Sequence, residues 1–231
     1  MFPSPALLTP RQFLRLTAGL LPACLLLILW LDQPLARFIH QHCAAWQPFF
    51  GSFTGAAELI YEATLRARLF KIPALFLGLG ISYVVGRWLL KLPQANVFLV
   101  LLLVHLASVP TSNVLKGVLN RLRPAALFNP GYPGLGFNYP HHPHTGSFPS
   151  AHTATFFSLF LPLVLAFPRL RPLLIVPVLI GLGRLVLDMH YLSDVLFSVW
   201  LVVLFTFLAS QLARLPAIAG PQAALPQNQR L

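Results

Sequence analysis

Long apolar segments follow one another along this chain, and they constrain its fold more than any other feature. A helix needs about 20 mostly apolar residues to cross a bilayer, and six segments come close to that length. Prolines inside some of them are tolerated where neighbouring helices satisfy the freed backbone groups. We therefore predict an all-α protein, a six-transmembrane-helix bundle that forms a single domain over residues 1–215. The approximate bounds of the segments are 14–31, 72–90, 95–115, 153–167, 173–189 and 192–212.

The composition agrees with a membrane location. Hydrophobic residues make up 57% of the chain and charged residues only 9%, whereas a soluble domain carries about 25% charged residues. No nucleic-acid recognition motif or basic face accompanies the net charge of +11, so we expect no nucleic-acid partner. Basic residues beside apolar segments instead contact anionic lipid headgroups or set the topology. Cys24 lies inside an apolar segment and Cys43 beyond it, so we expect no disulfide between them.

Three segments lack membrane character. Residues 32–71 carry several charges, and we expect one or two interfacial helices there. Residues 124–149 are rich in Pro, Gly, His and aromatic residues, a composition typical of an ordered irregular loop. Residues 216–231 are rich in Pro, Gln and Ala, and we predict a disordered C-terminal tail.

The distribution of Lys and Arg indicates the orientation once the predicted site is set aside. With the N-terminus inside, the sixteen Lys and Arg residues divide eight to eight between the two sides of the membrane. Four of the outer cations, Lys116, Arg121, Arg123 and Arg184, lie in or next to the motifs of the site described below, and setting them aside leaves eight inside against four outside. Because cytoplasmic loops carry the excess of positive charge, we predict that both termini face the inside.

Three polar clusters stand out against this charge-poor background. The first ends the third span, the second begins the fourth, and the third crosses the junction of the fifth and sixth. Successive spans alternate in direction, so all these segment ends lie on one side of the membrane and the clusters should converge. On a helix, Lys116 and Arg123 would share a face, and His190 and Asp194 would be within hydrogen-bonding distance. The clusters are Lys116, Arg123 and Pro124; Pro149, Ser150, Ala151 and His152; and Arg184, His190 and Asp194.

These residue types suit a phosphate group. Lys and Arg supply charge and hydrogen-bond donors for a dianion whose transition state spreads charge over its oxygens. Ser150 and the backbone N–H groups that begin the fourth helix add donors where the helix dipole favours an anion. Two histidines provide a nucleophile and a general acid. Asp194 can hold one ring nitrogen of His190 and leave the other to attack phosphorus.

The clusters closely resemble the signature of the type 2 phosphatidic acid phosphatase (PAP2) superfamily. That pattern is Lys-x6-Arg-Pro, then Pro-Ser-Gly-His, then Ser-Arg-x5-His-x3-Asp, and nine positions of this chain match it at the same spacing. Two positions differ, because Ala151 replaces the usual Gly and Gly183 replaces the usual Ser. The resemblance covers residues 116–194 by motif and the whole chain by its six spans, so it implies a bundle of the PAP2 type.

The resemblance also implies a covalent mechanism that uses no metal and no other cofactor. His190 would be the nucleophile and would form a phosphohistidine that water hydrolyses. Asp194 would orient His190, and His152 would protonate the leaving oxygen. The residues that would hold the phosphoryl oxygens are Lys116, Arg123, Ser150, Ala151 and Arg184.

Plainer interpretations remain open for several charged residues. As an isolated pair, Lys116 and Arg123 would extend from a helix end toward the interface. Arg184 could pair with Asp188 four residues on, and Arg121 could contact a headgroup or be an ordinary surface charge.

Histidines outside the clusters call for separate interpretations. His105 lies in mid-span, and we expect it to form a hydrogen bond across helices. A zinc site in the loop before the fourth span is disfavoured, since Pro143 interrupts the histidines and no Cys or carboxylate lies nearby. We expect a solvated, substrate-side loop at His141, His142 and His144.

We therefore predict a multi-pass membrane lipid phosphatase. The resemblance places it in a bacterial inner (plasma) membrane, with the active site facing the periplasm or outside. Undecaprenyl diphosphate, phosphatidylglycerol phosphate, phosphatidic acid and lipid A phosphates are all open as substrates. Two alternatives remain: a lipid phosphotransferase using the same phosphohistidine, and a non-catalytic anion or lipid transporter. A transporter would not require the pair of His190 and Asp194.

Overall fold

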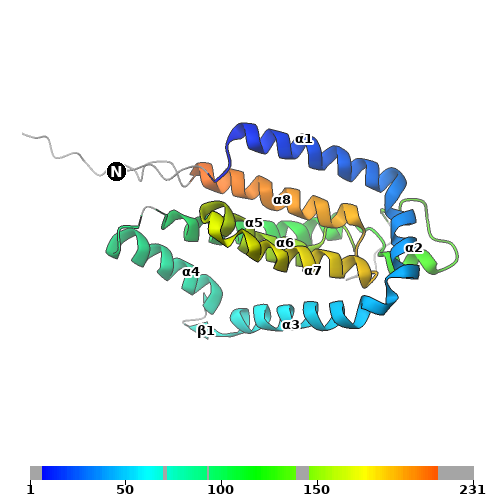
Figure 1. The fold of residues 1–231 in the computed structure, drawn as a ribbon, viewed down its shortest axis with the longest axis horizontal. Helices are drawn as coiled ribbons and strands as arrows, with labels where there is room; N and C mark the ends of the chain where they lie inside the picture. The colour runs from blue at the N-terminus through cyan, green and yellow to red at the C-terminus, as the bar shows by residue number, and fades with distance from the viewer. Residues whose placement is uncertain (1–6, 70–71, 93, 139–145, 213–231) are drawn as a thin grey trace, which may run out of the picture.

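Helices dominate the part of the chain described by this computed structural model, residues 7–69, 72–92, 94–138 and 146–212. Most of them run lengthwise beside one another, and α2 crosses one end of the bundle (Figure 1). The predicted all-α fold class is therefore confirmed. The histidines at 141, 142 and 144 and the tail at 216–231 lie outside the described residues, so the expectations for them stay predictions.

The order of the elements is simple. Short π-helical or 3-10 turns join several of the helices, and β1 and β2 form an antiparallel hairpin of two residues each. The α-helices are α1 (Pro10–Leu26), α2 (Asp32–His42), α3 (Gln47–Arg66), α4 (Ala74–Val84), α5 (Asn96–Leu119), α6 (Ala151–Ala166), α7 (Ile175–Val186) and α8 (Leu192–Leu212). The other elements are η1 (Leu27–Leu31), η2 (Ala44–Trp46), β1 (Arg68–Leu69), β2 (Ile72–Pro73), η3 (Val85–Leu89), η4 (Pro124–Phe128) and η5 (Pro168–Leu174).

Local sequence signals set three helix ends. Thr9 and Gln12 form a reciprocal capping box before α1, which satisfies two backbone N–H groups that the helix itself leaves unpaired. Ser150 caps α6 in the same sense by accepting from the backbone N–H of Thr153. Asn120 ends α5 in the left-handed region, with φ of 36°, a conformation that Asn tolerates better than most residues.

The centre of the bundle consists of α5, α6 and α8, which pack against one another. On the outside, α1 covers α8, α7 packs on α6, and α3 packs on α7. The core between the central helices is made of small and β-branched side chains, which allow helices to approach closely. It includes Val100, Val104, Ala154, Val202 and Ala209.

A buried histidine adds a polar link to this core. His105 of α5 lies between the hydroxyl of Tyr61 on α3, 3.0 Å from Nε2, and Ser158 Oγ on α6, 2.8 Å from Nδ1. The predicted hydrogen bond of His105 across helices is therefore confirmed.

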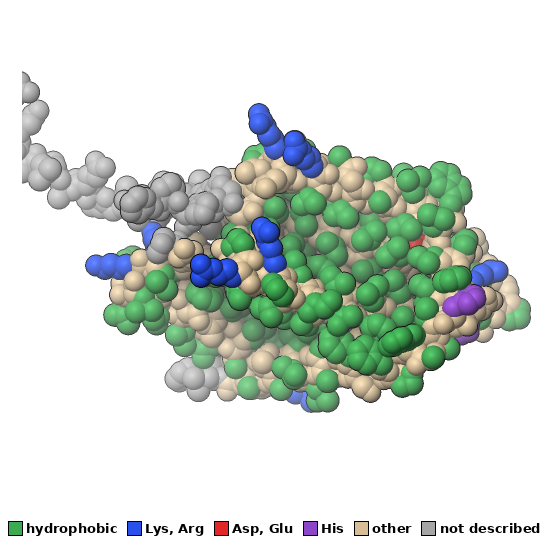
Figure 2. Space-filling model, in the orientation of Figure 1, with side chains coloured by type: hydrophobic (Ala, Val, Ile, Leu, Met, Phe, Trp, Pro, Cys, Tyr) green, Lys and Arg blue, Asp and Glu red, His purple; other side chains and the backbone are tan. Residues whose placement is uncertain are grey.

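The surface of the bundle exposes many large apolar side chains, unlike the surface of a soluble protein. Large apolar side chains such as Leu59, Trp88 and Leu89 are more than two-thirds exposed, and hydrophobic side chains cover most of the face in Figure 2. Within the described residues, three helical stretches are long and apolar enough to cross a bilayer, namely Pro10–His42, Asn96–Phe128 and Leu192–Leu212. The protein is therefore a membrane protein.

The segment at 32–71 forms the helices α2 and α3, and their position relative to a membrane stays a prediction. Helix α2 crosses the end of the bundle as an interfacial helix would, but α3 runs back along α7. Helix α3 carries Glu58 and Glu62 and is not among the stretches apolar enough to cross a bilayer. In the fold, Glu62 pairs with Arg66 at 2.5 Å, and Glu58 pairs with a histidine described below. Apolar residues such as Leu59 then face outward.

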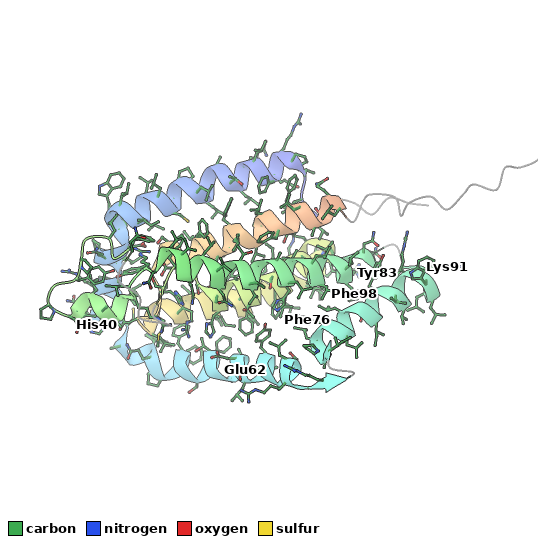
Figure 3. The ribbon with its side chains drawn as sticks, turned by 180° about the vertical axis from the view of Figure 1, so that it is seen from behind. His40, Glu62, Phe76, Tyr83, Lys91 and Phe98 are labelled. Carbon is green, nitrogen blue, oxygen red and sulfur yellow. The ribbon has the colours of Figure 1, made fainter. Side chains whose placement is uncertain are left out.

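The predicted second span, 72–90, corresponds to α4 and η3, a shorter apolar helical stretch. It packs beside α5 at the end of the bundle away from α2. Figure 3 marks these opposite ends by Lys91 and His40. The expected crossing by this segment is not confirmed, and the count of six crossings stays a prediction.

The two ends of the described chain meet at one end of the bundle. The rings of Phe13 in α1 and Phe207 in α8 stack with centroids 4.5 Å apart. Most Lys and Arg side chains visible in Figure 2 lie in the same half of the molecule. This arrangement agrees with the prediction that both termini face one side of the membrane.

Candidate active site

The three polar clusters meet at the end of the bundle that carries α2, which we call the site end. Backbone hydrogen bonds tie them together: Ser147 N donates to Arg121 O at 2.7 Å, and Ser150 N donates to Asp194 O at 3.2 Å. Gly146 allows the loop to approach α5, because an added Cβ would come 2.9 Å from the carbonyl oxygen of Lys116. The convergence predicted from alternating spans is therefore present.

Two details of the predicted geometry are wrong. Lys116 and Arg123 do not share a helical face, because α5 ends at Leu119 and the chain turns at Asn120. His190 does not belong to the helix that carries Asp194, since α8 begins at Leu192. Helix ends depend on local capping and tertiary packing, which the spacing of motif residues does not reveal.

His190 is held by a backbone carbonyl rather than chiefly by a carboxylate. Its Nδ1 lies 2.7 Å from the carbonyl oxygen of Ser147 and 3.5 Å from Asp194 Oδ2. A carbonyl can only accept, so Nδ1 carries the proton and Nε2 has a free lone pair. Nε2 is buried and has no hydrogen-bond partner among the described residues.

The environment keeps this imidazole neutral. His190 is only 2% exposed, and burial lowers its pKa to about 4, although the neighbouring Asp194 acts in the opposite direction. Nearby Lys116 and Arg184 also disfavour a second positive charge. A neutral ring with an unpartnered Nε2 has the form that a nucleophile requires.

Asp194 lies in a buried charge network centred on Arg121. Arg121 Nη1 donates to Asp194 Oδ1 at 2.7 Å and to Ser193 Oγ at 2.8 Å, and Nη2 donates to Asp32 Oδ2 at 2.8 Å. Ser193 also donates to Asp32 through its hydroxyl. The network joins α1–α2, the end of α5 and the start of α8.

Arg121 is therefore not the surface charge or headgroup contact that its sequence position suggested. It is 1% exposed, and its guanidinium lies over the rings of Phe137 and Tyr191, 4.7 and 4.1 Å from their centroids. Planar guanidinium groups suit such stacked and forked contacts. Only the scarcity of acidic residues, five in the whole chain, hints in the sequence that each carboxylate has a specific partner.

Lys116 and Arg184 act electrostatically on both His152 and His190. Lys116, Arg123 and Arg184 are electrostatic neighbours of one another. Arg184 is 9% exposed, and its Nε has no hydrogen-bond partner among the described residues. Such a concentration of positive charge suits a bound dianion.

Arg184 does not form the alternative pair with Asp188. Asp188 Oδ2 instead lies 2.7 Å from His40 Nδ1 on α2. Asp188 has a positive φ of 54° in the connection between α7 and α8, which turns its side chain away from the register of a continuous helix. This pair helps to hold α2 across the site end.

The second motif cluster forms the beginning of α6. The hydroxyl oxygen of Ser150 accepts from Thr153 Oγ1 at 2.9 Å and from Thr153 N at 3.4 Å, so it serves the helix cap. Ala151 is the first residue of α6 and His152 the second. The first N–H groups of a helix are available to an anion because they have no partner within the helix.

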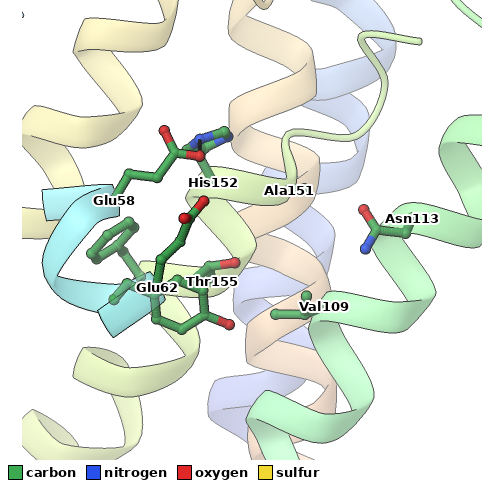
Figure 4. Close-up of a pocket in the computed structure, with 9 residues that line it drawn as sticks. Glu58, Glu62, Val109, Asn113, Ala151, His152 and Thr155 are labelled. Carbon is green, nitrogen blue, oxygen red and sulfur yellow. Dashed lines mark ion pairs between the residues drawn. The ribbon is translucent and has the colours of Figure 1, made fainter. Parts of the chain in front are cut away.

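His152 lies beside a small cavity between α3, α5 and α6. The cavity has a volume of about 180 Å³ and a rim that includes Glu58, Glu62, Asn113 and Thr155 (Figure 4). His152 Nε2 is 3.0 Å from Glu58 Oε1. Sequence analysis missed Glu58, because its helix was expected at the interface rather than against the bundle.

The departure from the family pattern at Gly183 has a packing reason. An added Cβ at this position would lie 2.9 Å from Thr54 Cγ2 and 3.0 Å from Phe50 Cδ1, both on α3. Real Cβ atoms essentially never approach other atoms this closely. The missing side chain therefore lets α3 pack directly on α7.

No cluster of three or more His, Cys, Asp or Glu side chains that could hold a metal ion occurs within residues 7–69, 72–92, 94–138 and 146–212. The polar side chains of the site are mainly cationic, and the two buried carboxylates of the network, Asp32 and Asp194, are committed to Arg121. The absence of a metal requirement stays a prediction.

A solved structure resembles the fold of this chain, and a family model matches its sequence. The crystal structure of the first transmembrane PAP2 type phosphatidylglycerolphosphate phosphatase from Bacillus subtilis resembles this chain with a TM-score of 0.55. The sequence identity is 21%, and the match covers 87% of this chain and 94% of that chain. No curated protein sequence matches the chain. The sequence model of the PAP2 superfamily matches residues 96–215, a range that holds all three motif clusters and over half of the chain. The protein therefore belongs to the PAP2 superfamily.

Proposed function

We propose that this protein is a membrane lipid phosphatase that removes a phosphate through a phosphohistidine intermediate. The observation that carries the proposal is the state of His190. Its Nδ1–H is bound by the Ser147 carbonyl at 2.7 Å, and its Nε2 is buried with no partner among the described residues. Such a nitrogen is oriented and desolvated for attack on an electrophile.

In the first stage, His190 Nε2 forms a bond to phosphorus and the bond from phosphorus to the lipid oxygen breaks. The leaving oxygen takes a proton from His152, at the start of α6. The positive charge on the phosphorylated ring is balanced by Asp194, 3.5 Å from Nδ1. Without the proton, a lipid alkoxide would be a poor leaving group.

In the second stage, water attacks phosphorus and the bond to His190 Nε2 breaks. His152, now neutral, accepts a proton from that water. Inorganic phosphate leaves, and both histidines return to their starting states. This cycle consumes one water molecule and needs no oxidant, reductant or metal-bound species.

The phosphoryl oxygens would be held by the three cations of the site, Lys116, Arg123 and Arg184. The backbone N–H of Ala151 adds a donor at the start of α6, where the helix dipole favours an anion. Preorganised donors of this kind stabilise the charge that builds up on the oxygens during transfer.

The exposed apolar surface and the membrane-crossing helices support a lipid as the substrate. The similar fold of the Bacillus subtilis phosphatidylglycerolphosphate phosphatase adds to this support. We propose that the protein lies in a bacterial inner membrane with its site end toward the periplasm. This orientation places the Lys- and Arg-rich end of Figure 2 in the cytoplasm.

The test is phosphate release by the purified protein in detergent. The substrates are undecaprenyl diphosphate, phosphatidylglycerol phosphate, phosphatidic acid and lipid A phosphates, each assayed with and without EDTA. We expect release from at least one lipid, unchanged by EDTA, and no release by His190→Ala. A folded wild-type protein that releases no phosphate from any of them would overturn the proposal.

A second lipid added as acceptor separates hydrolysis from phosphotransfer. Mass spectrometry of the products would show free phosphate for a hydrolase and a phosphorylated acceptor for a phosphotransferase. A transporter would release no phosphate, and its binding of the anion would be unchanged in His190→Ala.

A further inference from the structure

Glu58 is the one carboxylate from α3 that reaches a motif residue of the site among the described parts of the chain. Its Oε1 lies 3.0 Å from His152 Nε2. Figure 4 shows the two side chains facing each other across the rim of the cavity between α3 and α6. The Glu58 side chain is 44% exposed and that of His152 is 25% exposed, so the contact is open enough for protons to exchange with water.

The fold fixes α3 on both sides of this contact. One turn before Glu58, Thr54 packs where Gly183 lacks a side chain. One turn after it, the hydroxyl of Tyr61 lies 3.0 Å from His105 Nε2, and His105 is itself bound to α6. Residues four apart on a helix share a face, so these two anchors hold the intervening turn toward the site. The position of Glu58 is thus imposed by packing and does not depend on its own ion pair.

The charges around His152 explain what a carboxylate can do there. Burial above all, and then Arg184 and Lys116, lower the pKa of His152, whereas Glu58 acts in the opposite direction. Glu62 lines the same cavity but forms its own pair with Arg66 at 2.5 Å. Without Glu58, nothing among these influences would offset burial and the two cations, and the pKa of the general acid would be lower still.

We propose that Glu58 is a positioning residue that keeps His152 protonated on Nε2 and stabilises its imidazolium form. This inference rests on the proposed lipid phosphatase mechanism. Nε2–H donates to Glu58, so Nδ1 is the ring nitrogen left to exchange a proton with the substrate. Nδ1–H gives its proton to the leaving oxygen, and Nδ1 later takes one from the attacking water. Glu58 remains ionised throughout, and the Nε2 proton stays in place.

The experiment compares the pH dependence of phosphate release for wild type, Glu58→Gln, Glu58→Asp and the matched control Glu62→Gln. An opposite charge within hydrogen-bonding distance shifts a pKa by about 1–3 units in favour of the charged form. Because this contact is partly exposed, we expect a shift at the low end of that range. We expect the basic limb of the kcat profile to move down by about one unit in Glu58→Gln. In Glu58→Asp the basic limb should lie close to its wild-type pH, and in Glu62→Gln it should lie at the wild-type pH.

Leaving-group dependence gives a second readout that a structural role would not change. An aryl leaving group needs little protonation, so Glu58→Gln should slow alkyl lipid phosphates by about tenfold more than aryl phosphates. His152→Ala should also slow alkyl lipid phosphates more than aryl phosphates, by a larger factor on the order of 10²–10⁴, the contribution of one general acid. In the His152→Ala background, Glu58→Gln should have no further effect on this ratio, because the two residues act as a unit.

The outcomes separate the two proposals. If the wild type is active but Glu58→Gln leaves both the basic limb and the aryl-to-alkyl rate ratio unchanged, the role of Glu58 is overturned and the proposed phosphatase function is not. Histidine ¹⁵N spectra provide a readout independent of turnover. They should show the His152 imidazolium losing its proton at lower pH in Glu58→Gln than in wild type, and equal midpoints would also overturn the inference. A folded wild type that releases no phosphate from any lipid would remove the mechanism, and with it this role.

Discussion

Arg121 donates to Asp194 at 2.7 Å in an ion pair whose two side chains are at most 1% exposed. The other arm of the guanidinium pairs with Asp32 at 2.8 Å, equally buried. The carboxylate nearest to His190 therefore belongs to a network that also anchors the start of α2 to the start of α8. Fold and site depend on the same cation.

Removal of this cation should destabilise the protein strongly. Arg121→Met keeps much of the side-chain volume but leaves two buried carboxylates unpaired, and breaking a buried pair in this way costs about 3–5 kcal/mol. Thermal unfolding in detergent should show a large drop in Tm. The control Arg66→Met removes a pair whose Arg side chain is 79% exposed and should leave Tm almost unchanged. Equal small shifts in both variants would show that the network does not support the fold.

Asp194→Asn should slow turnover without changing the tautomer of His190. The Ser147 carbonyl, at 2.7 Å, is a nearer acceptor for Nδ1–H than Asp194 at 3.5 Å. In addition, Asp32 still compensates Arg121. The loss in kcat should stay well below the roughly 10⁴-fold that a wrong tautomer costs in serine proteases. It should also be smaller than the loss in His190→Ala. Phosphate release and histidine ¹⁵N shifts measure the two effects. A switch of the proton to Nε2 would mean that Asp194, and not the carbonyl, sets the tautomer.

His190 should remain neutral well into the acidic range. Burial lowers its pKa from 6.5 to about 4, so the free lone pair on Nε2 is present above that value and lost below it. Between pH 6.5 and 4 the unfolded chain takes up a proton that the folded chain does not, so stability should fall as the pH falls through this window. Titration of histidine ¹⁵N signals in substrate-free protein, assigned with His190→Gln, gives the midpoint. A value near 6.5 would show that the ring is not desolvated.

Gly183→Ser, which restores the usual residue of the family pattern, should be harmful in this chain. The new Cβ would lie 2.9 Å from Thr54 Cγ2, and overpacking of this kind costs about 1–3 kcal/mol. Tm should fall. Activity should fall as well, because α3 carries Glu58 and a displaced α3 moves Glu58 away from His152. Thr54→Ser removes the clashing methyl group and should recover part of both losses. The control Gly55→Ser has nothing within 4 Å of its added Cβ and should have little effect. A Gly183→Ser variant as stable as wild type would mean that α3 does not pack as described.

Topology can be tested with reporters at the two ends of the bundle. The stacked rings of Phe13 and Phe207 place the start of α1 beside the end of α8, and the site lies at the opposite end. A reporter fused after Arg214 should therefore be cytoplasmic, whereas one inserted at Gly134 should be exported. Reporters on the same side would contradict an odd number of crossings between them.

Much of the site follows from the sequence by itself. The scarcity of charge fixes a membrane protein, because a bilayer tolerates ionisable side chains only at paired or functional positions. Motif spacing then singles out His152, His190 and Asp194, since alternating spans bring widely separated segments to one side. These inferences use composition, segment length, the direction of successive helices and the resemblance of the motifs to the PAP2 signature.

Only the tertiary structure assigns the partners. Glu58, Asp32 and Arg121 carry no local signal of their own. The partners in their ion pairs lie 73 residues apart (Arg121 and Asp194) to 94 residues apart (Glu58 and His152) along the chain. A sequence window counts such residues as exposed charges, which is why α3 was expected at the interface. Once packed, each charge faces an opposite one, and its transfer out of water becomes tolerable. Burial and pairing are properties of three-dimensional contacts, so the supporting residues of this site emerge only when the helices are assembled.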